Sequence, residues 1–192
     1  MKVKSLFCIA PLLLGASAYA ASVCPAVGND TLGCELLITV TAVSSSGAAT
    51  AFTVTGSTPD QGPYDGADDT LVGILNSSGA TLSSIGLSGG STDIFGFDGD
   101  GACTYISCPG ATDPYGYAPA GVTFSGINGS GTSGTVNFGP ALASGSSAWF
   151  SLEEALTPSS IMASGPEPSS LLLMGVAVPA CWAFYRRRKG VR

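Results

Sequence analysis

Carboxylic acids are the main ionisable groups that the central part of this chain offers for chemistry. Twelve of the chain's 13 Asp and Glu residues lie between residues 21 and 165, a stretch that contains no Lys, Arg or His. Because the whole chain lacks His, Ser-His and Cys-His nucleophiles are impossible, and this stretch has no Lys nucleophile. Paired carboxylates, as in glycoside hydrolysis, are the remaining catalytic chemistry, but Asp in Gly-rich turns is usually solvated. We therefore expect a non-catalytic protein.

Many of these acids gather in two clusters that suit either turns or calcium. The clusters are Asp60, Asp65, Asp68 and Asp69, and then Asp93, Asp98 and Asp100. Calcium takes several oxygen ligands, often from Asp in a Gly-rich loop, and residues 98–101 (Asp-Gly-Asp-Gly) have this look. The twelfth position from Asp98 is Pro109, not the Glu of an EF-hand, and Asp-Gly pairs are strong hairpin signals. We favour hairpin turns, with calcium at Asp98 and Asp100 as the alternative and no other cofactor.

The charge pattern also excludes two classes of partner. A stretch with about twelve negative charges and no cation cannot neutralise phosphates, so nucleic acid is not expected as a partner. Anionic lipid surfaces are disfavoured for the same reason.

Cysteine usage in the same stretch predicts disulfides. Its four cysteines are Cys24, Cys34, Cys103 and Cys108. Four cysteines are an even number, which is typical of a disulfide framework in an oxidising compartment, and three connectivities are possible. Proximity along the chain favours Cys24–Cys34 and Cys103–Cys108. The spacings do not match zinc knuckles, and there is no His to complete a zinc site.

The elements that must position these groups are short strands. Alternating or β-branched runs bounded by Gly, Ser, Asn and Asp clusters are typical of strands and turns. They occur at residues 36–43, 51–55, 70–75, 81–87, 94–97, 121–127, 135–138 and 148–152. About eight strands at this spacing predict an all-β fold, a single antiparallel β-sandwich domain over residues 21–154. Residues 155–165, with Pro158 and several serines, are expected to be a linker.

The N-terminus has the layout of a secretory signal peptide. Lys2 and Lys4 precede an apolar run that is too short to span a bilayer, and the run leads to Ala18-Tyr19-Ala20. We expect residues 1–20 to be removed by signal peptidase, with Ala18 and Ala20 marking the cleavage site.

The C-terminus predicts a membrane segment. Residues 169–185 are largely apolar, and as a helix they would measure about 26 Å, slightly less than the hydrocarbon core. A basic cluster over residues 186–192 follows, in which Arg186, Arg187, Arg188 and Lys189 are consecutive. By the positive-inside rule these cations mark the cytoplasmic side, so the body of the protein faces away from the cytoplasm.

Residues 166–192 resemble the PEP-CTERM sorting signal of Gram-negative bacteria. The three parts of the resemblance are Pro166-Glu167-Pro168, the marginal transmembrane segment and the terminal basic cluster. The resemblance implies recognition by an exosortase, a membrane transpeptidase that cleaves near the motif and hands the protein to the cell surface. An anchor that is never cut is the alternative. Residues 68–76, 93–101 and 149–153 are similar to extracellular modules of other PEP-CTERM proteins, but this similarity implies no activity.

Two non-catalytic functions are consistent with these features. The resemblance favours a structural component of the cell surface or of an exopolysaccharide biofilm matrix, reached by way of the inner membrane. The alternative is a glycan-binding or adhesion module, calcium-dependent if the Asp98 and Asp100 site exists. Its candidate sugar-contacting residues are Tyr64, Tyr105, Tyr115 and Tyr117.

Overall fold

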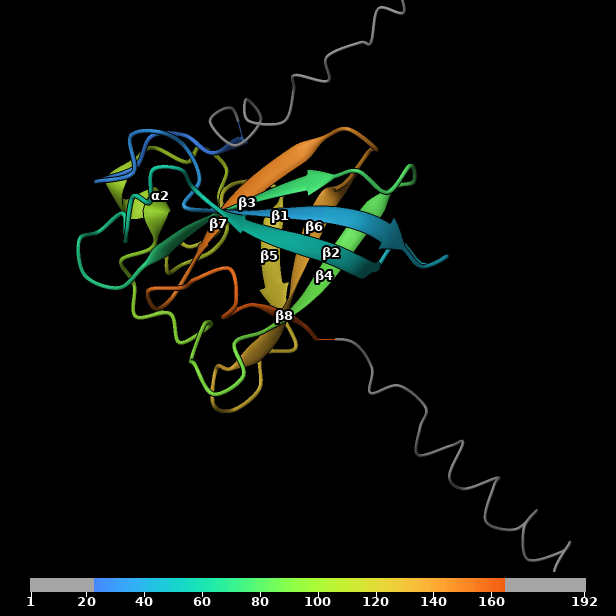
Figure 1. Cartoon of the computed structure of the whole chain (residues 1–192). Helices are drawn as coiled ribbons and strands as arrows, with labels where there is room; N and C mark the ends of the chain where they lie inside the picture. Colours follow the sequence, from blue (N-terminus) through green and yellow to red (C-terminus); the bar gives the residue numbers. More distant parts are fainter. Residues whose placement is uncertain (1–22, 165–192) are drawn as a thin grey trace, which may run out of the picture.

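The computed structural model describes residues 23–164, and these residues form two four-stranded sheets packed face to face (Figure 1). The strand order of the first sheet is β2 (Ala49–Gly56), β1 (Leu36–Val43), β3 (Thr70–Asn76) and β7 (Ser147–Leu152). That of the second is β5 (Val122–Ser125), β6 (Ser133–Leu142), β4 (Leu82–Ser88) and β8 (Met162–Ala163). The short helix α2 (Ala102–Tyr105) and several long loops gather at one end of the sheets. The predicted all-β class is confirmed.

The main core lies between the two sheets. Its members alternate along their strands, as expected where one face of each strand is buried. They include Ile38 and Val40 of β1, Ile74 of β3, Ile85 of β4 and Phe150 of β7, all completely buried. Leu152, also of β7, is completely buried in the same core.

The first sheet departs from the predicted antiparallel pattern at its centre. β1 pairs antiparallel with β2 but parallel with β3, because residues 57–69 cross from one side of β1 to the other. A parallel strand buried on both faces has a nearly continuous apolar sequence, and this explains the run Leu36 to Val40. The remaining strand pairs are antiparallel.

A second, smaller apolar cluster covers the outer face of β3. It comprises Cys24, Val27, Cys34, Tyr64, Leu71 and Ala102. A side chain at Gly73 would clash with this cover, because a Cβ there would lie 2.3 Å from the sulfur of Cys34. Gly73 therefore lets the N-terminal loop pack directly on the sheet.

Both expected disulfides are present. Cys24–Cys34 closes the loop that covers β3, and Cys103–Cys108 links α2 to the segment that follows it. The pairing inferred from proximity along the chain is confirmed.

Two sequence predictions about the elements are wrong. Residues 94–97 form no strand, because Ile94 and Phe95 reach the core from the β4–β5 connection, where Phe95 N–H donates to the carbonyl of Gly131. Residues 155–164 are not a linker, because Leu156 and Ile161 are buried in the main core and β8 pairs with β4. The serine- and proline-rich composition of residues 155–164 is typical of a linker and gives no sign that Leu156 and Ile161 are buried.

The predicted signal peptide (1–20), sorting motif (166–168), transmembrane segment (169–185) and basic cluster (186–192) lie outside the described residues. Within residues 23–164, no helix has the length and apolar character needed to cross a membrane.

Replacing Ile161 by Ala tests whether residues 155–164 belong to the domain. We expect the free energy of unfolding, measured by urea denaturation, to fall by about 2–4 kcal/mol, because the change removes buried methyl groups. The matched control is Met162→Ala at the adjacent, half-exposed side chain, which should change stability by less than about 0.5 kcal/mol. Equal, small effects of the two changes would show that this segment does not pack on the sheets.

Candidate functional site

Antiparallel pairing of β3 with β7 brings two acidic segments together. Thr70 at the start of β3 is opposite Leu152 at the end of β7, so the residues just outside these ends, Asp69 and Glu153, become neighbours. Carboxylate oxygens of Asp68, Asp69 and Glu153 lie within 4.8 Å of one another. Asp69 is completely buried, whereas Asp68 is exposed.

Asp98 and Asp100 reach the same place from the β4–β5 connection. Their carboxylates and those of Asp69 and Glu153 surround the hydroxyl oxygen of Tyr117. The distances from this oxygen are 2.7 Å to Asp100, 2.8 Å to Glu153, 3.3 Å to Asp98 and 3.5 Å to Asp69. We call Asp68, Asp69, Asp98, Asp100 and Glu153 the acidic centre.

The backbone fixes Tyr117 in this position. Its carbonyl accepts a hydrogen bond from the N–H of Ser151 in β7, at 2.9 Å. Its N–H donates to the carboxylate of Asp113 at 2.6 Å, and the ring of Phe97 stacks on its ring with centroids 4.3 Å apart. The completely buried Tyr117 ring thus places its hydroxyl among the acids without freedom to move away.

Tyr64 holds Asp69 from the other side. Its hydroxyl donates to one carboxylate oxygen of Asp69 at 2.5 Å. The other oxygen of Asp69 faces the Tyr117 hydroxyl, whose single proton is closer to Asp100 and Glu153. The single hydroxyl proton of Tyr117 cannot bind four carboxylates at once. The acidic centre therefore needs further protons or a cation to balance its negative charge.

Burial, hydrogen bonds and the crowding of like charges shift the pKa values of groups in and around the acidic centre. Burial raises the pKa of Asp69 to about 8, and the negative charges of Glu153, Asp100 and Asp65 add to the rise. Burial also raises the pKa of Glu153. The hydrogen bond from Tyr117 lowers the pKa of Asp100, whereas its neighbour Asp98, which shares a hydrogen bond with Asp100, has a raised pKa. The pKa of Tyr117 is raised, first by burial, so this hydroxyl keeps its proton.

A hard cation matches this set of groups. Calcium binds six to eight oxygen ligands, mainly carboxylate, carbonyl and water oxygens, and tolerates irregular geometry. Carboxylates from three separate segments converge here, and the described residues contain no Lys, Arg or His to neutralise them. The arrangement suits charge neutralisation by a bound cation.

The favoured hairpin turn at residues 98–101 is not present, and calcium at Asp98 and Asp100 stays a prediction. Asp98 and Asp100 do lie together, but they lie in the long β4–β5 connection and not in the favoured hairpin turn. Their partners Asp69 and Glu153 come from other segments, and only the strand register unites them. Asp65 instead caps a turn by accepting from the N–H groups of residues 67–69, and Asp93 lies beside Gly131, outside the acidic centre.

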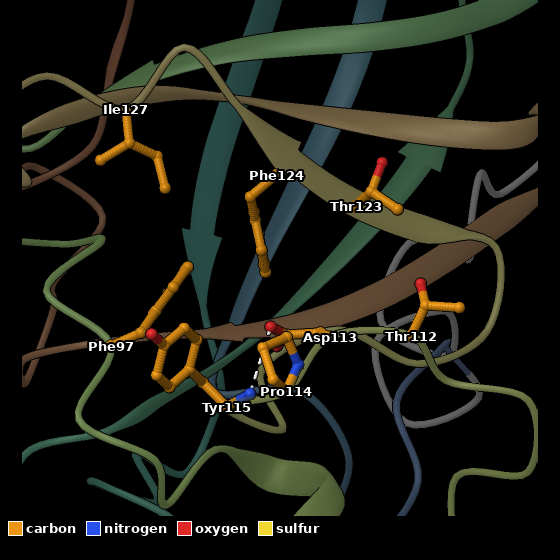
Figure 2. A pocket seen from close by; sticks show the side chains of 8 residues that line it. All are labelled: Phe97, Thr112, Asp113, Pro114, Tyr115, Thr123, Phe124 and Ile127. Carbon is orange, nitrogen blue, oxygen red and sulfur yellow. Dashed lines mark hydrogen bonds between the residues drawn. The ribbon is translucent and has the colours of Figure 1, made fainter.

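An open groove lies next to the acidic centre, and Figure 2 shows the side chains that line it. Its volume is about 270 Å³. Apolar walls come from Phe97, Pro114, Tyr115, Phe124 and Ile127, and polar groups from Thr112, Asp113 and Thr123. Tyr115 is 49% exposed and Ile127 40% exposed. Because Phe97 lines the groove and stacks on Tyr117, the groove and the acidic centre share a wall.

The four tyrosines proposed to contact sugars have different roles. Tyr64 and Tyr117 are completely buried and serve the acidic centre, so neither can stack on a sugar, and that prediction is wrong for both. Tyr105 and Tyr115 are about half exposed, and of these Tyr115 lines the groove.

No protein-family model matches the chain, and no curated protein or solved structure matches it significantly.

The raised pKa of Asp69 predicts a pH dependence of stability when divalent ions are removed. Between about pH 4 and pH 8 the folded protein holds a proton on Asp69 that the unfolded chain releases, so stability falls as the pH rises through this range. We expect a lower Tm at pH 8 than at pH 5 in a chelator, measured by circular dichroism. Asp69→Asn should reduce the difference.

The matched control for this measurement is Glu154→Gln, which removes a charge next to the acidic centre and should leave the pH dependence of Tm unchanged. A Tm that rises from pH 5 to pH 8 in the unmodified protein would contradict the assignment.

Proposed function

We propose that this chain is an exported, non-catalytic structural protein of the bacterial cell surface or of an exopolysaccharide matrix. The observation that carries the proposal is the pair of disulfides, because disulfides persist in oxidising, extracytoplasmic compartments. The sequence pattern at both ends supports the route: signal peptidase cuts after Ala20, the C-terminal segment holds the chain in the inner membrane, and an exosortase processes it near Pro166-Glu167-Pro168. Residues 23–164 then form the displayed part, an eight-stranded sandwich.

Cell fractionation with intact-mass measurement tests this route. In an exosortase-containing host we expect the surface fraction to contain a chain that begins at Ala21 and lacks the tail beyond the motif. Replacing Pro166, Glu167 and Pro168 by Ala should leave the tail attached and the protein in the inner membrane. A matched control is Ser159→Ala, which changes an exposed hydroxyl upstream of the motif. Recovery of the unmodified chain in the cytosol with both ends intact would refute the proposal.

The groove favours a second, more specific function, the binding of a glycan. Ligand sites typically combine apolar and aromatic walls with a few polar groups that fix orientation. The faces of Phe97, Tyr115 and Phe124 offer flat apolar area, and Thr112, Asp113 and Thr123 offer hydrogen-bonding groups. A surface protein that contacts matrix polysaccharide through this groove would combine both functions.

The shared wall connects this function to calcium. Phe97 stacks on Tyr117, and the Tyr117 hydroxyl stands among the carboxyl groups of four acids that repel one another when ionised. A cation bound by the acidic centre would remove this repulsion and hold the Phe97 wall in place. Binding of a glycan is therefore expected to depend on calcium.

Replacing Tyr115 by Ala tests the groove. On arrays of bacterial polysaccharide fragments in calcium, we expect the change to weaken binding about tenfold, or about 1.4 kcal/mol. Tyr105→Ala is the matched control, because Tyr105 is equally exposed but does not line the groove. Adding a chelator should weaken binding by the unmodified protein. Absence of binding both with and without calcium would leave the structural role and exclude the glycan-binding one.

A further inference from the structure

Two buried carboxyl groups, one within the Cys24–Cys34 loop and one directly after it, have oxygens without a hydrogen-bond partner among the described residues. Asp30 is completely buried, and neither of its carboxylate oxygens has a hydrogen-bond partner among the described residues. Glu35 is 4% exposed, and its Oε2 is likewise without a partner in that part of the chain. An unpaired buried carboxylate is among the costliest groups that a fold can contain, so these two require an explanation.

The fold holds Asp30 in this position. The backbones of Val27 and Asp30 exchange two hydrogen bonds of 2.9 and 2.8 Å, which closes a tight turn. Gly28 in this turn has a φ of +51°, and a Cβ there would lie 2.0 Å from the carbonyl oxygen of Tyr64. The N–H of Asn29 donates to the same oxygen at 2.7 Å. The turn is thus packed against residue 64, and these contacts fix the backbone at Asp30.

Glu35 is held equally firmly. It follows Cys34 directly, its N–H donates to the carbonyl of Leu71 at 3.0 Å, and its own carbonyl accepts from Ser57 at 2.8 Å. Glu35, Ser57 and Asp60 also line a cavity of about 240 Å³ that Leu156 and Thr157 help to close. The charges of Asp30 and Asp60 both act on Glu35. Asp60 is exposed, so it stands at the solvent side of this cavity.

We propose that Asp30 and Glu35 form a second cation site, which takes a divalent hard cation such as calcium through the cavity beside Asp60. Two carboxylate charges match one divalent cation. Calcium also accepts backbone carbonyls and water as ligands, so two carboxylates are sufficient as the charged part of its shell. The bound ion joins the Cys24–Cys34 loop to the start of β1 and so fastens the cover of the first sheet.

The competing explanation is that both groups stay protonated. Burial raises the pKa of Asp30 to about 7 and that of Glu35 to about 8, in each case with a contribution from neighbouring acids. Near neutral pH, protonation therefore neutralises these two carboxylates only in part. At pH 8 a part of their negative charge remains. Carboxylate protonation offers no response to calcium at fixed pH, so the two explanations give different results.

This site is separate from the acidic centre. The acidic centre is made by Asp68, Asp69, Asp98, Asp100 and Glu153, and neither Asp30 nor Glu35 takes part in it. The two can therefore be disabled independently, and the second site does not depend on glycan binding.

The test uses the purified full chain at pH 8, stripped with a chelator and then titrated with CaCl₂. The parent variant is Asp100→Asn with Glu153→Gln, which takes one carboxylate from the Asp98–Asp100 pair and one from the Asp68–Asp69–Glu153 group and so disables the acidic centre. We expect calcium to raise the Tm of this variant by about 5–10 °C at a concentration about 100-fold above its Kd. Adding Asp30→Asn and Glu35→Gln, which keep the side-chain shapes, should abolish this rise. Glu154→Gln in the same parent, which removes one carboxylate outside both sites, is the control and should retain the rise.

Two results would overturn the proposal: no calcium-dependent rise in the parent variant, or a rise that persists when Asp30 and Glu35 are replaced. If the fourfold variant does not fold, the single change Glu35→Gln in the parent, measured by calorimetric titration, decides the question. It should bind one calcium equivalent fewer than the parent or bind it at least about tenfold more weakly, and unchanged calcium binding would refute the site.

Discussion

The absence of positive charge from residues 21–165 is the constraint on which the rest of this molecule depends. In most domains a buried carboxylate is neutralised by Lys or Arg, whereas here it has to find water, a backbone N–H, a proton or an ion from outside. Asp65 and Asp113 use backbone N–H groups. In the acidic centre and the Asp30–Glu35 pair the hydrogen bonds present do not neutralise the acids, because several carboxyl groups lie together and some buried oxygens have no partner among the described residues. The stability of these two places therefore depends on solution conditions.

The fold concentrates the acids without a cationic partner at two places. Loops 23–35 and 57–69 supply Cys24, Val27, Cys34 and Tyr64 to the cover on the outer face of β3, and the same two loops carry Asp30, Glu35, Asp60, Asp65, Asp68 and Asp69. One place lies where β3 begins and β7 ends, and the other lies where the Cys24–Cys34 loop joins β1. The Phe97–Tyr117 stack connects the first of these to the open groove. The loops that cover the first sheet thus supply acids to both places, and the groove shares the Phe97 side chain with the acidic centre.

The sequence is informative about local features and less so about contacts between distant segments. Strand periodicity correctly located most of the strands, and short separations gave both disulfides, because these properties depend on neighbouring residues. The contact between Asp69 and Glu153 depends on a register between strands that are about 80 residues apart in the chain, which no local pattern encodes. The parallel β1–β3 pair was missed for the same reason. Residues 155–164 were misread because two apolar side chains among serines and prolines carry the packing.

The position of Ile161 has a consequence for how close a processing enzyme must work to the folded body. This side chain fills the core between the sheets, and β8 ends at Ala163, only three residues before Pro166. There is accordingly no long tether between the closed sandwich and the proposed cutting motif. An enzyme that acts there would have to bind the chain within a few residues of the folded domain. A cut only a few residues upstream would detach β8 or the core residue Ile161 from the rest of the chain.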